Sequence, residues 1–312
     1  MTGAAGFIGS HLVGRLVKLG CRVTALVRPA SGLERLQAVL SSVKLVECDL
    51  AAVEAQQLHH WIPEAQVVFH LAAAGVDQAR QDTSAIVRTN IMGTLELLQL
   101  ARTLGVERFV NCGSCFEYGS GSDLAEGRAS APANEYAASK VAAGALAHAF
   151  FRQYGLPVVS LRPFTVYGPL EGSRRLVPQV IRKALEGRDI ELTGGKQTRD
   201  FVFADDAVDA FLAAAVSAEA VGGVFNICSG VETSVRDLVS LIIQLSGTKA
   251  KPVFGAIPYR PDELWTQSGN PALAKEKLGW YARVSLEEGL RRSLAWYQQQ
   301  NPQVPKQGFD GR

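Results

Sequence analysis

The segment N-E-Y-A-A-S-K places a tyrosine and a lysine, Tyr136 and Lys140, four residues apart. On a helix, that spacing puts both side chains on one face. An ammonium one turn away favours the phenolate of a tyrosine, whose reference pKa of about 10 otherwise makes it a poor base at neutral pH. Ser114, just beyond the apolar run 109–112, carries a hydroxyl that can hydrogen-bond a reacting oxygen. The three residues together predict proton transfer to and from a substrate oxygen.

A glycine-rich loop opens the chain, where residues 2–12 read T-G-A-A-G-F-I-G-S-H-L. Gly3 permits a tight turn, Gly6 lets the backbone approach a pyrophosphate, and Gly9 lets the following helix pack closely. The N-terminus of that helix presents unpaired N–H groups and a positive dipole end to the phosphates, so the loop predicts a dinucleotide site. A Y-x-x-x-K pair alone would indicate only a surface helix. Beside a cationic nicotinamide ring, which together with the lysine would favour the phenolate, Tyr136 would act as a proton shuttle during hydride transfer.

Short Val-rich runs alternate with longer helical patterns, which is typical of a parallel sheet covered on both faces. The predicted strands are 22–27, 43–48, 67–71, 109–112 and 158–161, and the predicted helices are 8–19, 33–40, 84–104 and 135–154. We expect an α/β fold, a doubly wound parallel sheet that binds its ligand at the carboxyl ends of the strands. The strand before the glycine loop should be central, yet only Met1 precedes Thr2. We therefore expect a start that omits roughly five to ten upstream residues, about one strand length.

The rhythm changes after Pro163, and the later patterns predict a smaller C-terminal α/β substrate-binding domain. The predicted elements are helix 177–186, strand 190–193, helix 205–217, strand 224–228 and amphipathic helices at 234–246 and 285–299. Helix 205–217 and strand 224–228 are expected to return to the main sheet. The chain is predicted to form two domains. Residues 1–164 and 199–228 form the dinucleotide-binding domain, residues 165–198 and 229–300 form the substrate-binding domain, and residues 301–312 are a frayed tail.

The composition is that of a globular protein, with 47% apolar and 20% charged residues among 312. A net charge of +2 favours neither nucleic acid nor a membrane surface as partner. No apolar run approaches the ~20 residues of a bilayer helix and no signal peptide opens the chain, so we expect a cytoplasmic protein. The C-x-x-C of Cys112 and Cys115 lacks the second pair or the histidine that a redox or zinc site needs, and no metal site is predicted.

A series of motifs in one order makes the chain resemble the extended short-chain dehydrogenases/reductases of the nucleotide-sugar epimerase/dehydratase family. The motifs are T-G-A-A-G-F-I-G (2–9), C-D-L (48–50), H-L-A-A (70–73), N-I-M-G-T (90–94), C-G-S-C-F-E-Y-G (112–119), Y-A-A-S-K (136–140), L-R-P-F-T-V-Y-G-P (161–169), R-D-F-V-F-A-D-D (199–206) and L-G-W (278–280). The resemblance implies a Rossmann fold and an NAD(P)-dependent enzyme that acts at C4 of a nucleotide-diphosphate sugar. It also implies a homodimer formed through helices 84–104 and 135–154.

The resemblance implies roles for individual residues, with Ser114, Tyr136 and Lys140 as the catalytic set. Asn90 would support the active-site strands. Arg199 and Arg260 would clamp the nucleotide diphosphate with their forked guanidinium groups. The cofactor-binding residues that it implies are Gly3, Gly6, Phe7, Ile8, Gly9, Asp49 and Leu50 (at the adenine), Leu71, Ala72 and Ala73 (the two alanines on the diphosphate path), Tyr136, Lys140 and Pro163. The substrate-binding residues that it implies are Thr165, Arg199 and Arg260. The loop arginines Arg174 and Arg175 are weaker candidates that are more typical of solvated side chains.

Departures from the family pattern narrow the chemistry. Relatives that dehydrate a sugar carry acidic residues directly after the catalytic hydroxyl. Here Cys115 and Phe116 follow it, and Glu117 would point the other way on an extended stretch, so no dehydratase is expected. Thr165 stands where the epimerases usually have asparagine, which favours net reduction of a 4-keto sugar, with 4-epimerisation as the alternative.

Two further alternatives are weaker. A reductase of a non-nucleotide ketone would need no diphosphate clamp, so Arg199 and Arg260 argue against it. A non-catalytic NAD(P)-binding sensor or structural subunit is disfavoured by the intact Ser–Tyr–Lys set.

The residue after strand 22–27 bears on the choice of cofactor. Folds that bind NAD usually place Asp or Glu there to accept hydrogen bonds from the ribose. This chain has Arg28, with Ser31 in the same loop. An acid would repel a 2′-phosphate, whereas a guanidinium binds it through two charge-assisted hydrogen bonds. We therefore expect NADP(H), with NAD(H) as the alternative if Arg28 is only a solvated side chain.

Overall fold

A computed structural model of the chain describes residues 1–29, 31–76, 82–261 and 263–300. Its centre is a sheet in which four strands lie in the order β10, β6, β4, β3. These strands are β10 (Val224–Ile227), β6 (Val158–Pro163), β4 (Arg108–Cys112) and β3 (Val67–His70), and all their pairings are parallel. A further parallel pair, β1 (Val23–Val27) and β2 (Val43–Glu47), lies beyond β3.

Met1 and Thr2 lie between β3 and β1 and join the two parts of the sheet. Thr2 forms parallel bridges to Leu26 and to His70. Its N–H donates to the Phe69 carbonyl at 2.9 Å, and the Leu26 N–H donates to the Met1 carbonyl at 2.8 Å. This is the central position that was expected for the strand before the glycine loop.

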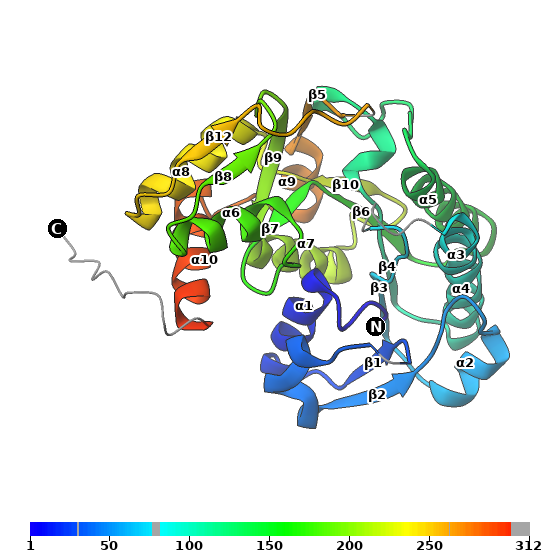
Figure 1. Ribbon diagram of the computed structural model, residues 1–312. Helices are drawn as coiled ribbons and strands as arrows, with labels where there is room; N and C mark the ends of the chain where they lie inside the picture. Colours follow the sequence, from blue (N-terminus) through cyan, green and yellow to red (C-terminus); the bar gives the residue numbers. More distant parts are fainter. Residues whose placement is uncertain (30, 77–81, 262, 301–312) are drawn as a thin grey trace.

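Helices cover both faces of the sheet (Figure 1). One face carries α1 (Phe7–Lys18), α7 (Ala204–Val216) and α9 (Ala272–Leu278), and the other carries α2 (Ala55–Trp61), α4 (Gly93–Leu104) and α5 (Glu135–Tyr154). Neighbouring strand residues point to opposite faces. Val110 and Val159 are therefore buried in the cluster with α1 and α7, while Phe109 and Val158 are buried in the cluster with α4 and α5. Burial on both faces explains the near-continuous apolar strands, and the predicted doubly wound α/β fold is confirmed.

Most predicted elements lie within two residues of the observed bounds, but two predicted helices differ in kind. Residues Glu34–Ser42 form a 3-10 helix. Predicted helix 84–104 is divided into α3 (Thr83–Val87), a π-helical turn (Arg88–Met92) and α4. The elements that periodicity did not indicate are short, because a few residues show no clear period: α2, α9, β5 (Gly121–Leu124), β7 (Thr165–Tyr167), β9 (Thr198–Phe203), β11 (Glu232–Ser234), β12 (Pro252–Phe254) and β13 (Gln267–Gly269).

A separate buried cluster lies in the C-terminal half, where the substrate-binding domain is expected. It packs α6 (Leu176–Leu185), α8 (Val235–Ser246) and α10 (Leu286–Gln300) with β8 (Ile190–Leu192). Ile181, Leu238 and Leu290 are fully buried in it. The proposed division into two domains stays a prediction, and the tail 301–312 lies outside the described residues. Across the described ranges, no helix is long and apolar enough to cross a bilayer.

Candidate active site

Ser114, Tyr136 and Lys140 come together at the carboxyl end of β4. Ser114 follows that strand and caps the 3-10 helix Cys115–Tyr118, while Tyr136 and Lys140 project from the start of α5. The Lys140 Nζ donates a hydrogen bond of 2.8 Å to the Cys112 carbonyl and lies 5.9 Å from the centroid of the Tyr136 ring. The Ser114 side chain acts on the Tyr136 hydroxyl and lowers its pKa. The structure thus brings the three predicted catalytic residues into one polar cluster.

Burial dominates the electrostatics of this cluster in the protein alone. It raises the pKa of Tyr136 above the ordinary value of 10.0, and it lowers the pKa of Lys140. The Ser114 side chain and the charge of Arg175 lower the pKa of Tyr136, but they do not outweigh the effect of burial. The neutral phenol therefore prevails in the protein alone, and the expectation that the lysine favours the phenolate together with a cationic nicotinamide ring stays a prediction.

A chain of hydrogen bonds joins the glycine loop to the π-helical turn. The His70 ring, 2% exposed, lies 2.7 Å from Thr2 Oγ1 through Nδ1 and 2.8 Å from Thr94 Oγ1 through Nε2. Thr94 donates to the Asn90 carbonyl at 2.6 Å, so it accepts from the Nε2 proton. Thr2 then donates to Nδ1 while its oxygen accepts the Ala72 N–H at 3.2 Å. Burial lowers the pKa of His70 to about 3, and the neutral ring matches this direction of donation.

Asn90 connects that chain to the catalytic helix. Its side-chain oxygen accepts the Ala74 N–H at 2.7 Å, and its amide nitrogen donates to the Ala74 carbonyl at 3.0 Å and to Ser139 Oγ at 2.8 Å. Ser139 in turn donates to the Tyr136 carbonyl at 2.7 Å. Single π-helical turns frequently occur at functional sites, and this one aims Asn90 at the segment after β3. The contacts support the expectation that Asn90 braces the active site.

The glycine loop forms a backbone cradle at the start of α1. Gly3 has φ +67°, and a Cβ there would lie 2.6 Å from the backbone of Leu71 and Ala72. A Cβ at Gly9 would collide with the Gly3 carbonyl. Gly6 is the exposed N-cap of α1 and offers no capping side chain, so the first N–H groups of the helix lack intrahelical partners. Such a helix start binds phosphates, and the loop with Phe7 and Ile8 therefore fits a dinucleotide.

The remaining predicted cofactor residues follow the strands at the same edge. Arg28 directly follows β1 and is exposed. Near the end of β2, Leu50 is buried, whereas Asp49 is exposed and its carboxylate accepts the Ala51 N–H at 3.0 Å. After β3 come Leu71, Ala72 and Ala73, and β6 ends at Pro163. Because parallel strands end at one edge, these residues share the ligand-binding side of the sheet.

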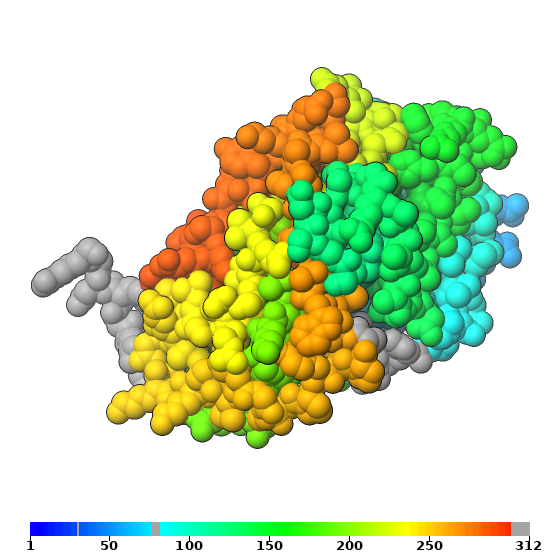
Figure 2. All heavy atoms as spheres, turned by 90° about the horizontal axis from the view of Figure 1, so that it is seen from above, coloured from blue at the N-terminus to red at the C-terminus, as the bar shows by residue number. Residues whose placement is uncertain are grey.

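On the substrate side, Arg199 of β9 is held by groups far along the chain. It forms an ion pair with Glu263 at 2.8 Å, and its Nη1 donates to the carbonyls of Thr198 at 2.7 Å and Leu264 at 2.6 Å. Strand β13 pairs with β5, and Figure 2 shows the surface of that orange C-terminal region against the green segment that follows the catalytic turn. Sequence reasoning missed Glu263, because no spacing relates it to Arg199.

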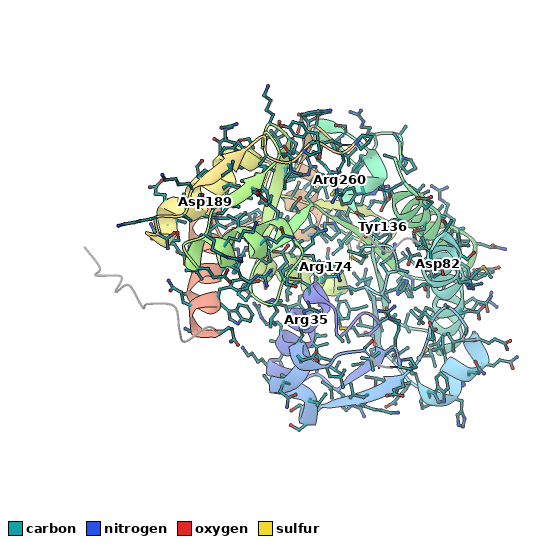
Figure 3. The ribbon with its side chains drawn as sticks, in the orientation of Figure 1. Arg35, Asp82, Tyr136, Arg174, Asp189 and Arg260 are labelled. Atoms are coloured by element: carbon teal, nitrogen blue, oxygen red, sulfur yellow. The ribbon has the colours of Figure 1, made fainter. Side chains whose placement is uncertain are left out.

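The other predicted substrate residues lie on separate segments of the chain. Thr165 begins β7 and is half-buried, and Arg260 is exposed. Figure 3 shows Arg174 and Arg260 in the central part of the view, as it shows Tyr136, whereas Asp189 lies toward the edge. Arg175 is exposed, its Nε lies 3.8 Å from Glu171, and its charge lowers the pKa of Tyr136.

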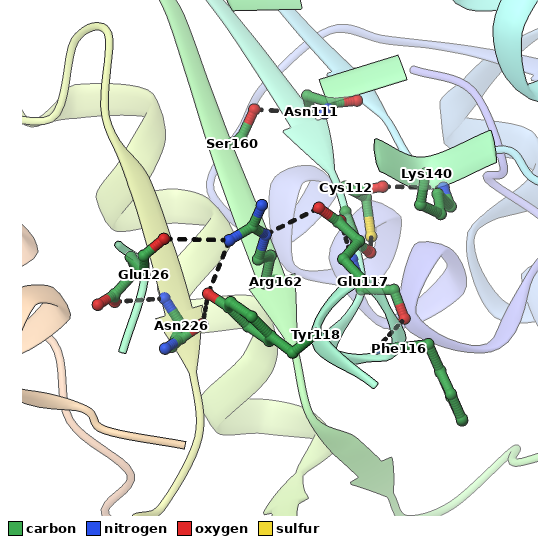
Figure 4. A network of polar contacts seen from close by, with 12 residues as sticks. Asn111, Cys112, Phe116, Glu117, Tyr118, Glu126, Lys140, Ser160, Arg162 and Asn226 are labelled. Carbon is green, nitrogen blue, oxygen red and sulfur yellow. Dashed lines mark hydrogen bonds and ion pairs between the residues drawn. The ribbon is translucent and has the colours of Figure 1, made fainter. Parts of the chain in front are cut away.

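Glu117 is the residue that sequence reasoning placed wrongly. Its segment forms a 3-10 turn instead of an extended stretch, so Glu117 turns inward and is 3% exposed. Its Oε1 accepts the Ser114 N–H at 2.8 Å and its Oε2 accepts Arg162 Nε at 2.8 Å (Figure 4). The four-residue pattern S-C-F-E is that of a capping box, and this pattern is the sequence signal that predicts a contact between Glu117 and the Ser114 N–H.

Within the described residues, no group of three or more His, Cys, Asp or Glu side chains is arranged to hold a metal ion. Burial raises the pKa of the free thiols of Cys112 and Cys115, the latter to about 12. Thiols of this kind are unreactive at neutral pH.

Known proteins are similar to this chain in amino-acid sequence and in overall fold. The model of the NAD dependent epimerase/dehydratase family matches residues 1–228. The UDP-glucose 4-epimerase of Mycolicibacterium smegmatis is 35% identical over 95% of this chain and 97% of its own. The UDP-glucose 4-epimerase of Thermotoga maritima, solved with UDP-glucose, has a TM-score of 0.88 at 30% identity and covers 96% of this chain and 98% of that chain. MoeE5 in complex with UDP-glucuronic acid and NAD has a TM-score of 0.84 at 32% identity and covers 96% and 98%.

Proposed function

The chain belongs to the NAD dependent epimerase/dehydratase family, and on that premise we propose that it is a 4-epimerase of nucleotide-diphosphate sugars that uses UDP-hexoses. The observation that carries the proposal is the Ser114–Tyr136–Lys140 cluster at the strand edge that also holds the glycine loop. Net reduction of a 4-keto sugar, the first expectation from the sequence, is less well supported. The relatives include a UDP-glucose 4-epimerase at 35% identity, and a similar structure holds NAD.

The residues of the cluster divide the acid–base work. Held by the glycine loop, NAD would supply a nicotinamide that accepts a hydride from C4 and returns it. The Tyr136 phenolate oxygen takes the proton of the C4 hydroxyl during oxidation, and the resulting phenol gives it back during reduction. Ser114 hydrogen-bonds the same oxygen and so holds it at the phenol. Lys140, fixed on the Cys112 carbonyl, keeps its ammonium beside the ring and favours the phenolate once the site is complete.

The residues after Ser114 argue against loss of water from the sugar. Cys115 is buried and Phe116 is apolar, so neither exchanges protons with C5 or C6. Glu117 is occupied by the Ser114 N–H and by Arg162. The chemistry supported here is therefore confined to C4.

Arg199 and Arg260 are proposed to bind the nucleotide diphosphate. Arg199 is presented on a strand, and its Nη1 and Nη2 are already fixed by two carbonyls and Glu263. These contacts hold the guanidinium group in one orientation, so that its Nε side is proposed to face the anion. Arg260 is exposed, and its carbonyl accepts the Glu263 N–H at 3.2 Å, so it is proposed to bind the same anion from the segment that holds Arg199.

A 4-keto-sugar reductase that uses NADP(H) is the second candidate, and Arg28 is the observation that favours it. Arg28 is exposed at the end of β1, where a 2′-phosphate would lie and where an acid would favour NAD. Dissociation constants for NADPH and NADH are to be measured for wild type and Arg28→Asp. A wild-type preference for NADPH that swings about tenfold toward NADH in the variant would support this candidate.

We also propose a homodimer through the helices of the α4–α5 face. Met92 and Val87, next to α4, leave apolar side chains 48% and 41% exposed. Pairing with a second copy would remove them from water. Light scattering of wild type and Met92→Glu is the test, and dimeric wild type with a dissociated variant is the expected result.

The function is tested with UDP-, GDP-, CDP- and dTDP-hexoses and no added coenzyme. A rise in melting temperature identifies the nucleotide that binds, because a ligand of the folded state stabilises it by mass action. The expected product is the C4 epimer of a UDP-hexose. Consumption of added NADPH with a 4-keto sugar and no epimer would instead support the second candidate.

A further inference from the structure

We propose that Glu117 is a positioning residue of the active site, whose carboxylate, clamped by Arg162, orients Ser114 and keeps a negative charge beside Lys140. The inference rests on the proposed function, because it assigns a role within the same site. Both contacts are drawn in Figure 4, where Glu117 stands between the guanidinium of Arg162 and the end of β4.

Two hydrogen bonds from backbone N–H groups fix Ser114 relative to Glu117 and the turn that follows. The Ser114 N–H donates to Glu117 Oε1 at 2.8 Å, while the Ser114 Oγ accepts the Phe116 N–H at 3.2 Å. A Cβ at Gly113 would lie only 2.5 Å from the same Oε1, so the glycine leaves the space that the carboxylate occupies. Main chain and hydroxyl of Ser114 are therefore both fixed before any substrate binds.

Arg162 holds the other carboxylate oxygen and is itself held from several directions. Besides the 2.8 Å contact with Glu117, its Nη1 donates to the Tyr118 hydroxyl at 2.7 Å and its guanidinium carbon lies 4.6 Å from the Tyr118 ring centroid. Tyr118 donates to Asn226 of β10 at 2.8 Å. The ion pair is thus anchored to the sheet through β6 and β10, and such a satisfied network keeps a buried charge in one geometry.

The charge of Glu117 matters because Lys140 is buried. Burial lowers the pKa of Lys140, and Cys112 and Glu117 oppose that effect. Burial also raises the pKa of the Cys112 thiol, so this neighbour is uncharged near neutral pH. Tyr136 is a neutral phenol in the protein alone, and His70, on the other side, is neutral with a pKa of about 3. Of the described groups that raise the pKa of Lys140, Glu117 is therefore the one proposed to supply a negative charge that keeps Lys140 an ammonium.

Glu117→Gln separates the charge from the contact, because glutamine still offers an oxygen to the Ser114 N–H. NADH affinity is measured by fluorescence across the pH range in wild type and variant. Loss of a negative charge lowers the pKa of a neighbouring ammonium, so the alkaline loss of NADH affinity, and of turnover, should move to lower pH. An unmoved midpoint would overturn the charge role.

Glu126→Gln is the matched control, since Glu126 belongs to the same network but accepts the Asn226 N–H at 2.8 Å instead of that of Ser114. Its alkaline midpoint should equal that of wild type. A midpoint that moved equally in both variants would overturn the assignment to Glu117.

Glu117→Asp tests the orienting role, because it keeps the charge but withdraws the carboxylate by one methylene. Turnover should fall about 10–100-fold, as expected for a misplaced reacting group, with the alkaline midpoint unmoved. Unchanged turnover in Glu117→Asp would overturn the orienting role. If Glu117→Gln does not fold, Glu117→Asp is the variant that tests whether Glu117 positions the active site. NADH binding requires no sugar, so a failure of every sugar to react would contradict the proposed function and leave this readout intact.

Discussion

The catalytic edge and the substrate side hold their polar groups in different ways. At the edge, Ser114, Tyr136 and Lys140 are placed by one strand end and the first turns of one helix. On the substrate side, Arg199 is held by Glu263 from a distant segment. The proposed catalytic residues thus lie in short contiguous motifs, whereas the proposed substrate-binding arginine is positioned by tertiary pairing between segments that share no motif.

Tyr136→Phe is the sharpest test of the catalytic edge. Removal of the hydroxyl takes away the shuttle proton but leaves the ring and its packing, so turnover should fall by ~100-fold or more. Steady-state turnover and NADH binding are measured together. Retained turnover on a verified substrate would contradict the mechanism, and loss of NADH binding would show that the residue is structural instead.

Ser114→Ala should have a smaller effect at the same edge. It removes one hydrogen bond to a developing charge, about 1.5–3 kcal/mol, which corresponds to a fall in turnover of roughly 10–150-fold. Ser139→Ala is a control in the same helix, and it should reduce turnover less because the hydrogen bonds of the Ser139 hydroxyl within the described residues are to Asn90 and the Tyr136 carbonyl. A larger effect in the control would reverse the assignment.

Arg199→Lys probes the substrate side, where binding should change and chemistry should not. Lysine keeps the charge but loses the fork, so KM for the nucleotide sugar should rise about tenfold with kcat nearly unchanged. Glu263→Gln is the partner variant, and it should also raise KM because Arg199 loses its support at 2.8 Å. A fall in kcat with constant KM would place Arg199 in the chemistry instead.

Glu171 is expected to give the smallest effect, on stability. Burial raises its pKa from 4.5 to about 8, with Arg175 opposing. The folded state then binds more protons than the unfolded state between about pH 4.5 and 8, so the free energy of unfolding falls as pH rises through that window. Glu171→Gln should remove this part of the slope. Melting temperatures of both proteins from pH 5 to about 8 test it, and parallel curves would refute the prediction.

The parts of the site that the sequence predicts are those in which backbone geometry restricts residue type. Gly3 must adopt a positive φ and Gly9 must approach the Gly3 carbonyl, so a glycine pattern is enough to find the loop. The spacing of Tyr136 and Lys140 follows from the helix in the same way. The sheet was found because strands buried on both faces show long apolar runs.

The parts that the sequence does not predict depend on burial or on distant partners. Glu117 was expected to point away because its segment was taken as extended, whereas a 3-10 turn directs it inward. The direction of the Tyr136 pKa depends on how far the phenol is removed from water, which no spacing shows. Glu263 reaches Arg199 only through the tertiary fold.

A C4-deuterated UDP-hexose tests the proposed epimerase most directly. With purified protein and no added coenzyme, the proposal predicts the C4 epimer with deuterium kept at C4 and no net change in nicotinamide absorbance. This result is expected because the hydrogen that leaves C4 returns to it within one site. Absence of the epimer, or an epimer whose deuterium has been lost, would contradict the proposed function.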